Sequence, residues 1–243
     1  ATAAGVDPVE FRLRYLSEPR AAELLRATAD RAGWKVHTQP QQAEGQNGAS
    51  DIVHGQGVAY ARYVHSKWPG YGAAWAAWVA DVQVHKTTGE VHVQRVVVGH
   101  DAGLMVNPAG VVHQVHGNVL QTTSRALKAQ VRLDSQTNVV AGREWGSYPI
   151  LSFREVPVIE VMTMPRPGEP PLGAGESASV PGTAAIASRL AMDSKATWPM
   201  LAARPSQNWR TLTGSSMLGF LGGLRCVRRR SATARRAAWA CWR

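Results

Sequence analysis

The spacing of apolar and polar residues divides the chain into segments with helical periodicity and segments with the two-residue alternation of β-strands. The first helical pattern begins at Asp7-Pro8-Val9-Glu10. Because Asp can accept hydrogen bonds at a helix N-cap and Pro suits the first helical position, this stretch predicts a helix start. Apolar residues then recur at helical spacing as far as Gly33. Pro19 predicts a break between two short helices.

Three β-rich runs follow a polar, Gly-containing stretch at 39–51, which we interpret as a loop. The runs occupy residues 58–64, 76–86 and 91–100. The Thr-Thr-Gly-Glu sequence at 87–90 separates the last two runs and predicts a hairpin turn. The last run contains three consecutive valines, which predicts burial on both faces of the sheet.

Asn107-Pro108 repeats the pattern of a cap followed by proline and predicts a long helix that continues to about Gln130. Three further elements are expected: a short strand and turn at 131–140, a strand at 157–164, and a helix at 181–192. Strands, a hairpin and helices in this order predict an α+β fold, with mixed sheets and packed helices.

The net charge of +10 is concentrated at the C-terminal end. Residues 211–243 contain seven arginines and no acidic residue, so they carry +7 and the other 210 residues only +3. A basic tail could bind nucleic acid or an acidic partner, and this stays open as the alternative to an enzymatic function. The two cysteines, Cys226 and Cys241, are too few for an iron–sulfur cluster, which needs four protein ligands.

The stretch with the clearest chemical content runs from Pro170 to Pro181 and reads Pro-Pro-Leu-Gly-Ala-Gly-Glu-Ser-Ala-Ser-Val-Pro. Consecutive prolines favour an extended approach, and Gly173 and Gly175 let the backbone pass close to a bound group. Glu176 follows directly, and a carboxylate at that point could act as a general base. The pattern alone leaves open an ordinary turn whose Glu complements a helix dipole.

This stretch resembles the Gly-x-Gly-Glu loop of the molybdenum hydroxylases of the xanthine dehydrogenase/aldehyde oxidase family. It resembles in particular the large (beta) subunits of the isoquinoline and nicotinate oxidoreductase type. Together with further matching stretches, the resemblance covers about residues 5–187. These stretches follow the family's order and are residues 7–14, 55–59, 88–91, 107–108, 113–117 and 154–157.

The resemblance implies an oxidoreductase that hydroxylates an aldehyde or an N-heteroaromatic carbon with water-derived oxygen. It implies that Glu176 is the catalytic base. It also implies that Gln114, Gly173, Ala174 and Gly175 bind the cofactor, although a solvent-facing helical position stays open for Gln114. The histidines at 113 and 116 share a helix face, but the family holds molybdenum through pterin dithiolene sulfurs, so no protein ligand to the metal is expected.

The cofactor implied by the resemblance is molybdopterin, either as such or as its cytosine dinucleotide. Iron–sulfur clusters are expected only on a partner, a small [2Fe–2S] subunit, because this chain lacks the cysteines to bind them. The remainder of the large subunit and a small-molecule substrate are the other expected partners, and nucleic acid is not expected. The expected compartment is the cytoplasm, with the periplasm as the alternative.

Residues 1–187 are therefore interpreted as the C-terminal part of a molybdopterin-binding domain, which we do not expect to be active as an isolated chain. The likeness ends near Ala187. Residues 188–243 are expected to form a divergent, Arg-rich and poorly ordered tail. Its bias towards Arg, Ala, Trp and Gly is typical of an out-of-frame reading of a GC-rich gene, and a shifted frame near residue 188 is our hypothesis for it.

Overall fold

The computed structural model describes residues 1–39, 51–64, 72–144 and 146–190. The central part of the predicted loop at 39–51, residues 191–243 of the predicted divergent tail and both cysteines lie outside these residues. In the part of the chain that is described, no helix is long and apolar enough to cross a membrane.

The chain begins with a 3-10 turn, η1 (Thr2–Ala4), followed by helices α1 (Pro8–Tyr15) and α2 (Pro19–Ala32). The predicted cap is confirmed, because the Asp7 carboxylate accepts hydrogen bonds from the backbone N–H groups of Val9 and Glu10. The predicted break at Pro19 is confirmed as the first residue of α2. Gly33 caps the C-terminus of α2, and its φ of 67° lies in the left-handed region that glycine tolerates without strain.

Four strands form one mixed sheet in the order β1-β2-β3-β4. They are β1 (Ile52–Tyr63), β2 (Ala74–His85), β3 (Val91–Asp101) and β4 (Val158–Thr163). Strand β2 pairs antiparallel with both β1 and β3, whereas β4 joins β3 in parallel. A mixed sheet with packed helices confirms the α+β prediction, and the predicted hairpin joins β2 to β3.

Strand β1 starts at Ile52, earlier than the predicted start at residue 58. The intervening Gly55-Gln56-Gly57 stretch carries little strand signal, because glycine disfavours strands. The register explains the extension, since Ile52 pairs with His85 at one end of β2 and Tyr63 pairs with Ala74 at the other. Pairing along the whole of β2 therefore overrides the local preference.

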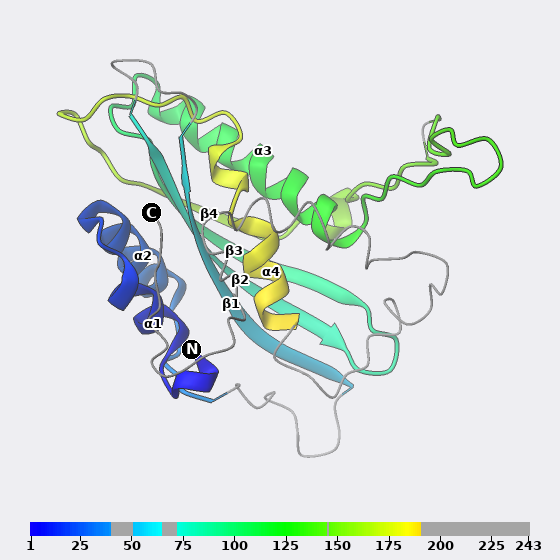
Figure 1. Cartoon of the computed structure of the whole chain (residues 1–243), viewed down its shortest axis with the longest axis horizontal. Coiled ribbons are helices and arrows are strands. Elements are labelled where there is room, and N and C mark those ends of the chain that lie inside the picture. The colour runs from blue at the N-terminus through cyan, green and yellow to red at the C-terminus, as the bar shows by residue number, and fades with distance from the viewer. Residues whose placement is uncertain (40–50, 65–71, 145, 191–243) are drawn as a thin grey trace, which may run out of the picture. The chain divides into compact units, whose positions relative to one another are not determined.

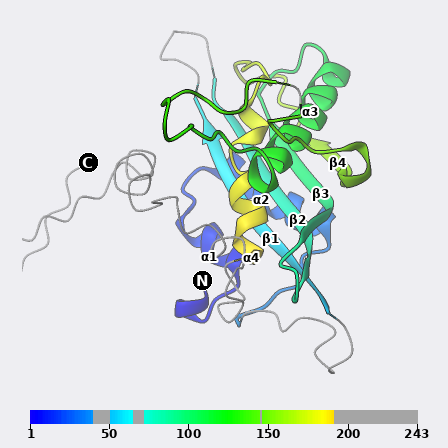
Figure 2. The same ribbon diagram turned by 90° about the vertical axis from the view of Figure 1, so that its right-hand side faces the viewer.

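Helices cover both faces of the sheet (Figures 1 and 2). They are α3 (Pro108–Leu127) and α4 (Gly182–Leu190) on one face and α1 and α2 on the other. One core cluster joins the sheet to α3 and α4 through Trp78, Val98 and Ile186. A second cluster joins the opposite face to α2 through Leu24 and Val97. The predicted burial of β3 on both faces is thus confirmed.

Successive side chains at the end of β3 point to opposite layers, as the alternation of a strand requires. His100 continues the face of Val98 and contacts Ser177 in the Gly-rich loop region. Asp101 points to the other face and contacts Arg20 of α2. Both side chains are fully buried. The end of β3 therefore contacts the Gly-rich loop region on one face of the sheet and α2 on the other face.

Two predicted elements are shorter than expected. Helix α3 ends at Leu127 rather than near Gln130. In place of a strand at 131–140, one isolated bridge joins Leu133 to Val140.

Helix α4 packs so closely against the sheet that a Cβ added at Gly182 would lie 2.7 Å from the Trp78 ring. Two 3-10 turns complete the described elements: η2 (Phe153–Glu155) and η3 (Ser177–Ser179).

Candidate functional site

A hollow of about 640 Å³ lies where α3 faces the Gly-rich loop. We call it the α3 hollow. Three of the residues predicted for the site line it, namely Gln114, Gly175 and Glu176. The other lining residues include Gly117, Asn118, Gln121, Ser124, Arg125, Tyr148, Ile150 and Leu151. The structure thus brings together parts of the chain that are far apart in sequence.

Two side chains of α3 hold the Gly-rich loop in place. Gln114 Nε2 donates to the Gly175 carbonyl oxygen at 3.1 Å, and Asn118 Nδ2 donates to the same oxygen at 2.8 Å. Gln114 is therefore an exposed helical residue whose side-chain amide also contacts the loop, and its binding of the cofactor stays a prediction. Gly175 has a φ of 35°, which favours glycine and lets the chain turn directly before Glu176.

Asn118 lines the α3 hollow, and one of its side-chain polar atoms has no hydrogen-bond partner among the described residues. Its Nδ2 donates both to the Gln114 backbone oxygen at 2.7 Å and to the Gly175 oxygen at 2.8 Å. These two carbonyl acceptors fix the amide orientation, because only the nitrogen can donate. Asn118 Oδ1 is then a buried acceptor that receives no hydrogen bond from the described residues. Such an atom fits a ligand with an N–H or O–H group.

Sequence reasoning missed Asn118, although a usable signal was present. Gln114 and Asn118 are four residues apart on a helix, so they lie on the same face. Once Gln114 is assigned to the site, the next polar side chain on that face becomes a candidate as well. The burial of Asn118 could not have been predicted in this way, because it depends on a loop that lies 57 residues further along the chain.

Glu176 lies at the edge of the hollow with its side chain 65% exposed. Arg125 Nη2 lies 3.6 Å from Glu176 Oε1, and the Arg125 side chain is also half exposed. An ion pair of this length between exposed groups contributes little to stability. The carboxylate is thus held at the hollow by its backbone, while its side chain stays accessible.

The backbone around Glu176 is held more firmly than its side chain. Ser177 N–H and Ser177 Oγ both donate to the Ala174 carbonyl oxygen, at 2.9 and 2.6 Å. Ser179 Oγ donates to the Glu176 carbonyl oxygen at 2.7 Å. Trp78 Nε1 donates to the Ala178 carbonyl oxygen at 2.6 Å. Of the other predicted site residues, Ala174 belongs to this turn and Gly173 precedes it, and neither lines the α3 hollow.

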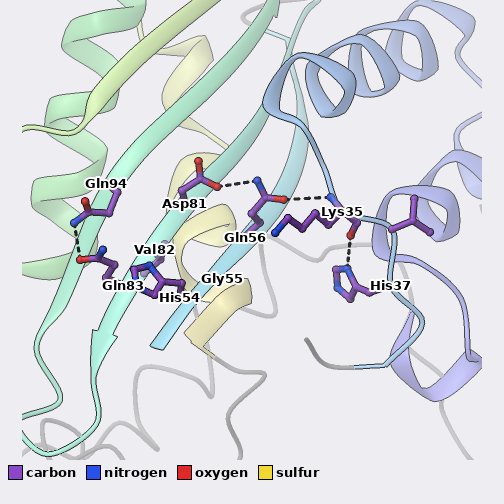
Figure 3. Close-up of a pocket in the computed structure, with 10 residues that line it drawn as sticks. Lys35, His37, His54, Gly55, Gln56, Asp81, Val82, Gln83 and Gln94 are labelled. Atoms are coloured by element: carbon purple, nitrogen blue, oxygen red, sulfur yellow. Dashed lines mark hydrogen bonds between the residues drawn. The ribbon is translucent and has the colours of Figure 1, made fainter. Parts of the chain in front are cut away.

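A second hollow of about 540 Å³ lies beside β1, β2 and the segment after α2, and we call it the β1 hollow (Figure 3). Figure 3 shows Gln56 between Asp81 and the backbone of Lys35. Gln56 Nε2 donates to Asp81 Oδ1 at 2.8 Å, and Lys35 N–H donates to Gln56 Oε1 at 3.4 Å. None of the predicted site residues lines this hollow.

The two histidines of α3, His113 and His116, are not gathered into a metal site. His113 and His116 are both exposed. Within the described part of the chain, no three or more His, Cys, Asp or Glu side chains come together in a group that could hold a metal ion.

The chain belongs to the molybdopterin cofactor-binding domain family, whose model matches residues 12–157. It is 62% identical over 190 residues to a nicotinate dehydrogenase subunit of Pseudomonas putida. This match covers 78% of the chain but only 16% of that protein. It is also 30% identical over 156 residues to the beta subunit of isoquinoline 1-oxidoreductase of Brevundimonas diminuta, covering 64% of the chain and 18% of that protein. The family expected from the motifs is thereby confirmed.

Solved structures also match over part of the chain. CO dehydrogenase from Oligotropha carboxidovorans is 23% identical with a TM-score of 0.45, over 61% of this chain and 19% of that one. Quinoline 2-oxidoreductase from Pseudomonas putida 86 is 25% identical with a TM-score of 0.44, over 49% of this chain and 16% of that one. The chain therefore spans less than a fifth of the length of these relatives.

Proposed function

We propose that the chain forms part of the large subunit of a molybdenum hydroxylase, and that the α3 hollow is one wall of its cofactor site. The observation that carries the proposal is that Gln114, Gly175 and Glu176 line one hollow. The enzyme would hydroxylate an aldehyde or an N-heteroaromatic carbon with oxygen from water. Nicotinate is the first substrate to test, because the relative that is 62% identical is a nicotinate dehydrogenase subunit.

The residues of the α3 hollow fit a pterin-type cofactor. Asn118 Oδ1 is a buried acceptor in need of a donor, and a pterin ring carries N–H groups. Gly175 presents backbone without a side chain, and an added Cβ there would meet none of the described atoms within 4 Å. Gln114 adds an exposed amide with donor and acceptor atoms. These three residues would hold the cofactor, which when bound supplies the redox centre for hydroxylation.

Glu176 is proposed as the general base. Its carboxylate lies at the edge of the hollow and accepts no capping hydrogen bond from the turn that follows it, so an oxygen is available to take up a proton. The turn fixes the backbone position of Glu176, and the exposed Glu176 side chain can reach a bound substrate. Positioned general bases contribute roughly 10²- to 10⁴-fold to rates.

The remainder of the large subunit is the first proposed partner. Apolar side chains between residues 131 and 158 are exposed, among them Leu133 at 63%, Ile150 at 62% and Phe153 at 99%. Exposed apolar side chains gathered in one segment mark an interaction surface. The green segment that extends away from the sheet in Figure 1 carries several of them. Since the relatives are several times longer than this chain, we assign this surface to the rest of the large subunit.

We also propose the form of the cofactor, the electron-transfer partner and the compartment from the resemblance to this family. The cofactor is molybdopterin or its cytosine dinucleotide, and electrons leave through a small [2Fe–2S] partner subunit. The cytoplasm is the proposed compartment, with the periplasm as the alternative. The nucleic-acid alternative gains no support, because the family match at residues 12–157 lies wholly outside the basic tail.

Reconstitution tests the proposed function. The chain is co-produced with the preceding part of the large subunit of the nicotinate dehydrogenase relative and with its iron–sulfur partner. We expect a complex that contains stoichiometric molybdenum and oxidises nicotinate with an artificial electron acceptor. The control is the same preparation without this chain, which should lack both. An assembled complex without molybdenum and without oxidation of nicotinate or of aldehydes would contradict the proposal.

A further inference from the structure

A buried chain of hydrogen bonds connects the end of β3 to the turn that carries Glu176. His100 Nε2 lies 2.9 Å from Ser177 Oγ, and Ser177 Oγ lies 2.6 Å from the Ala174 carbonyl oxygen. His100 is fully buried, and Ser177 is 3% exposed. We propose that His100 is a positioning residue for Glu176, because it fixes the Ala174–Ser177 turn through Ser177. The inference rests on the proposed role of Glu176.

The direction of the hydrogen bonds follows from the single proton of a serine hydroxyl. Two oxygens 2.6 Å apart repel each other without a proton between them, so Ser177 donates to the Ala174 carbonyl oxygen. Ser177 Oγ must then accept a hydrogen bond from His100, which places a proton on His100 Nε2. The histidine therefore orients the hydroxyl, and the hydroxyl closes the turn.

The ring of His100 is suited to this role only in its neutral form. Burial lowers the pKa of His100 to about 4, although the nearby Asp101 charge acts in the opposite direction. At neutral pH the ring thus carries one proton. With that proton on Nε2, Nδ1 is an acceptor, and it is buried without a hydrogen-bond partner among the described residues. With the proton on Nδ1 instead, His100 would no longer donate to Ser177, and Nδ1 would gain no acceptor among the described residues.

His100 completes a set of contacts that hold the turn from three elements. Asn118 of α3 holds the Gly175 carbonyl oxygen, and Trp78 of β2 holds the Ala178 carbonyl oxygen. His100 of β3 holds the residue between them, directly after Glu176. A misplacement of about 1 Å at a reacting group can cost roughly 100-fold in rate. Loss of this contact is therefore expected to lower kcat and to leave KM nearly unchanged.

Nuclear magnetic resonance of the 243-residue chain tests the contact without any cofactor. We expect the ¹⁵N shifts of His100 at pH 7 to report a proton on Nε2 and none on Nδ1. In His100→Leu, amide hydrogen exchange of Ser177 should become roughly tenfold faster, since a hydrogen bond contributes about that much. His100→Gln keeps a donor near Nε2 and should exchange within about threefold of wild type.

Thr28→Val is the matched control, because Thr28 is a buried hydroxyl residue on the other face of the sheet. It should leave exchange at Ser177 unchanged. If His100→Leu does not fold, Ser177→Ala replaces it with the same expectation for the exchange of the amide at 177. A charged ring, a proton on Nδ1, or wild-type exchange in the folded variant would overturn the inference.

Kinetics of the reconstituted enzyme separate this inference from the proposed function. We expect kcat to fall roughly 10- to 100-fold in His100→Leu, with KM within about twofold and most of the rate restored in His100→Gln. An inactive Glu176→Gln together with a fully active His100→Leu would defeat the inference alone. A fully active Glu176→Gln would defeat the proposed role of Glu176 as the general base, and the resonance experiments would still decide whether His100 orders the turn.

Discussion

Replacing Glu176 by Gln in the reconstituted enzyme is expected to lower kcat by about 10²- to 10⁴-fold, the range that a positioned general base contributes. An amide is nearly the same size as a carboxylate but cannot take up the proton. The side chain is 65% exposed and its ion pair with Arg125 is long, so the substitution should not affect folding. Molybdenum content and melting temperature should therefore match those of the wild type.

The matched control is Glu90→Gln, which changes an exposed carboxylate in the hairpin between β2 and β3. It should leave turnover unchanged. The measurement is steady-state turnover with nicotinate alongside metal analysis of the same samples. Wild-type turnover in Glu176→Gln would contradict the assignment, whereas a variant without molybdenum would mean that Glu176 holds the cofactor rather than a proton.

Replacing Asp101 by Asn is expected to give the largest loss of stability among the substitutions considered. The side chain of Asp101 is 0% exposed. It accepts hydrogen bonds from Arg20 at 2.5 Å, from Arg166 at 3.1 Å and from the backbone N–H of Gly103 at 3.1 Å. The variant leaves two guanidinium groups beside a neutral amide. Breaking a buried ion pair in this way costs roughly 3–5 kcal/mol in the free energy of unfolding.

The pH dependence of this loss has a definite sign. Burial opposes ionisation of Asp101, but the hydrogen bonds from Arg20, Gly103 and Arg166 outweigh it, so its pKa lies below the ordinary value of 3.8. A carboxylate with a lowered pKa in the folded state stabilises the protein above its unfolded pKa and loses this contribution as pH falls. The difference between wild type and variant should be complete at pH 7 and shrink below about pH 4.

Urea denaturation of the 243-residue chain at pH 7 measures the effect. Glu23→Gln is the matched control, because Glu23 pairs with Arg166 in the same cluster while its side chain is 54% exposed. An exposed pair contributes about 0–1 kcal/mol, so this variant should stay close to wild type. Equal stability of Asp101→Asn and Glu23→Gln would show that the buried Asp101 carboxylate does not stabilise the fold through Arg20 and Arg166.

The ion pairs of Asp101 with Arg20 and Arg166 also help to position the Gly-rich loop. Arg20 donates to Glu169 at 2.9 Å, and Arg166 bonds to Asp101, so both join the end of β3 to the segment that leads into the Gly-rich loop. Further along that segment, the backbone N–H of Leu172 donates to the Ala102 carbonyl oxygen at 2.9 Å. The approach to the loop is thus fixed before the chain reaches Gly175.

Local signals carried much of the prediction from sequence. The cap at Asp7, the break at Pro19 and the hairpin between β2 and β3 depend on neighbouring residues, and the structure confirms each of them. Gln114 and Glu176 were both predicted for the site on the strength of family motifs. The structure places both at the α3 hollow. Their roles in binding and catalysis stay predictions.

Long-range contacts explain what the sequence could not reveal. His100 and Ser177 are 77 residues apart, and nothing local to either residue indicates the other. His100 and Asp101 are neighbours at the end of one strand, yet their side chains make contacts on opposite faces of the sheet. The early start of β1 likewise depends on pairing with β2, which no pattern within β1 itself encodes.

Hydrogen exchange of the reconstituted enzyme, compared with and without its molybdenum cofactor, tests the central claim most directly. We expect the cofactor to slow exchange at the loop residues that line the α3 hollow, namely Tyr148, Ile150, Leu151, Gly175 and Glu176, and to leave residues 54–56 and 81–83 beside the β1 hollow unchanged. Slower exchange at the β1 hollow with no change around Glu176 would contradict it.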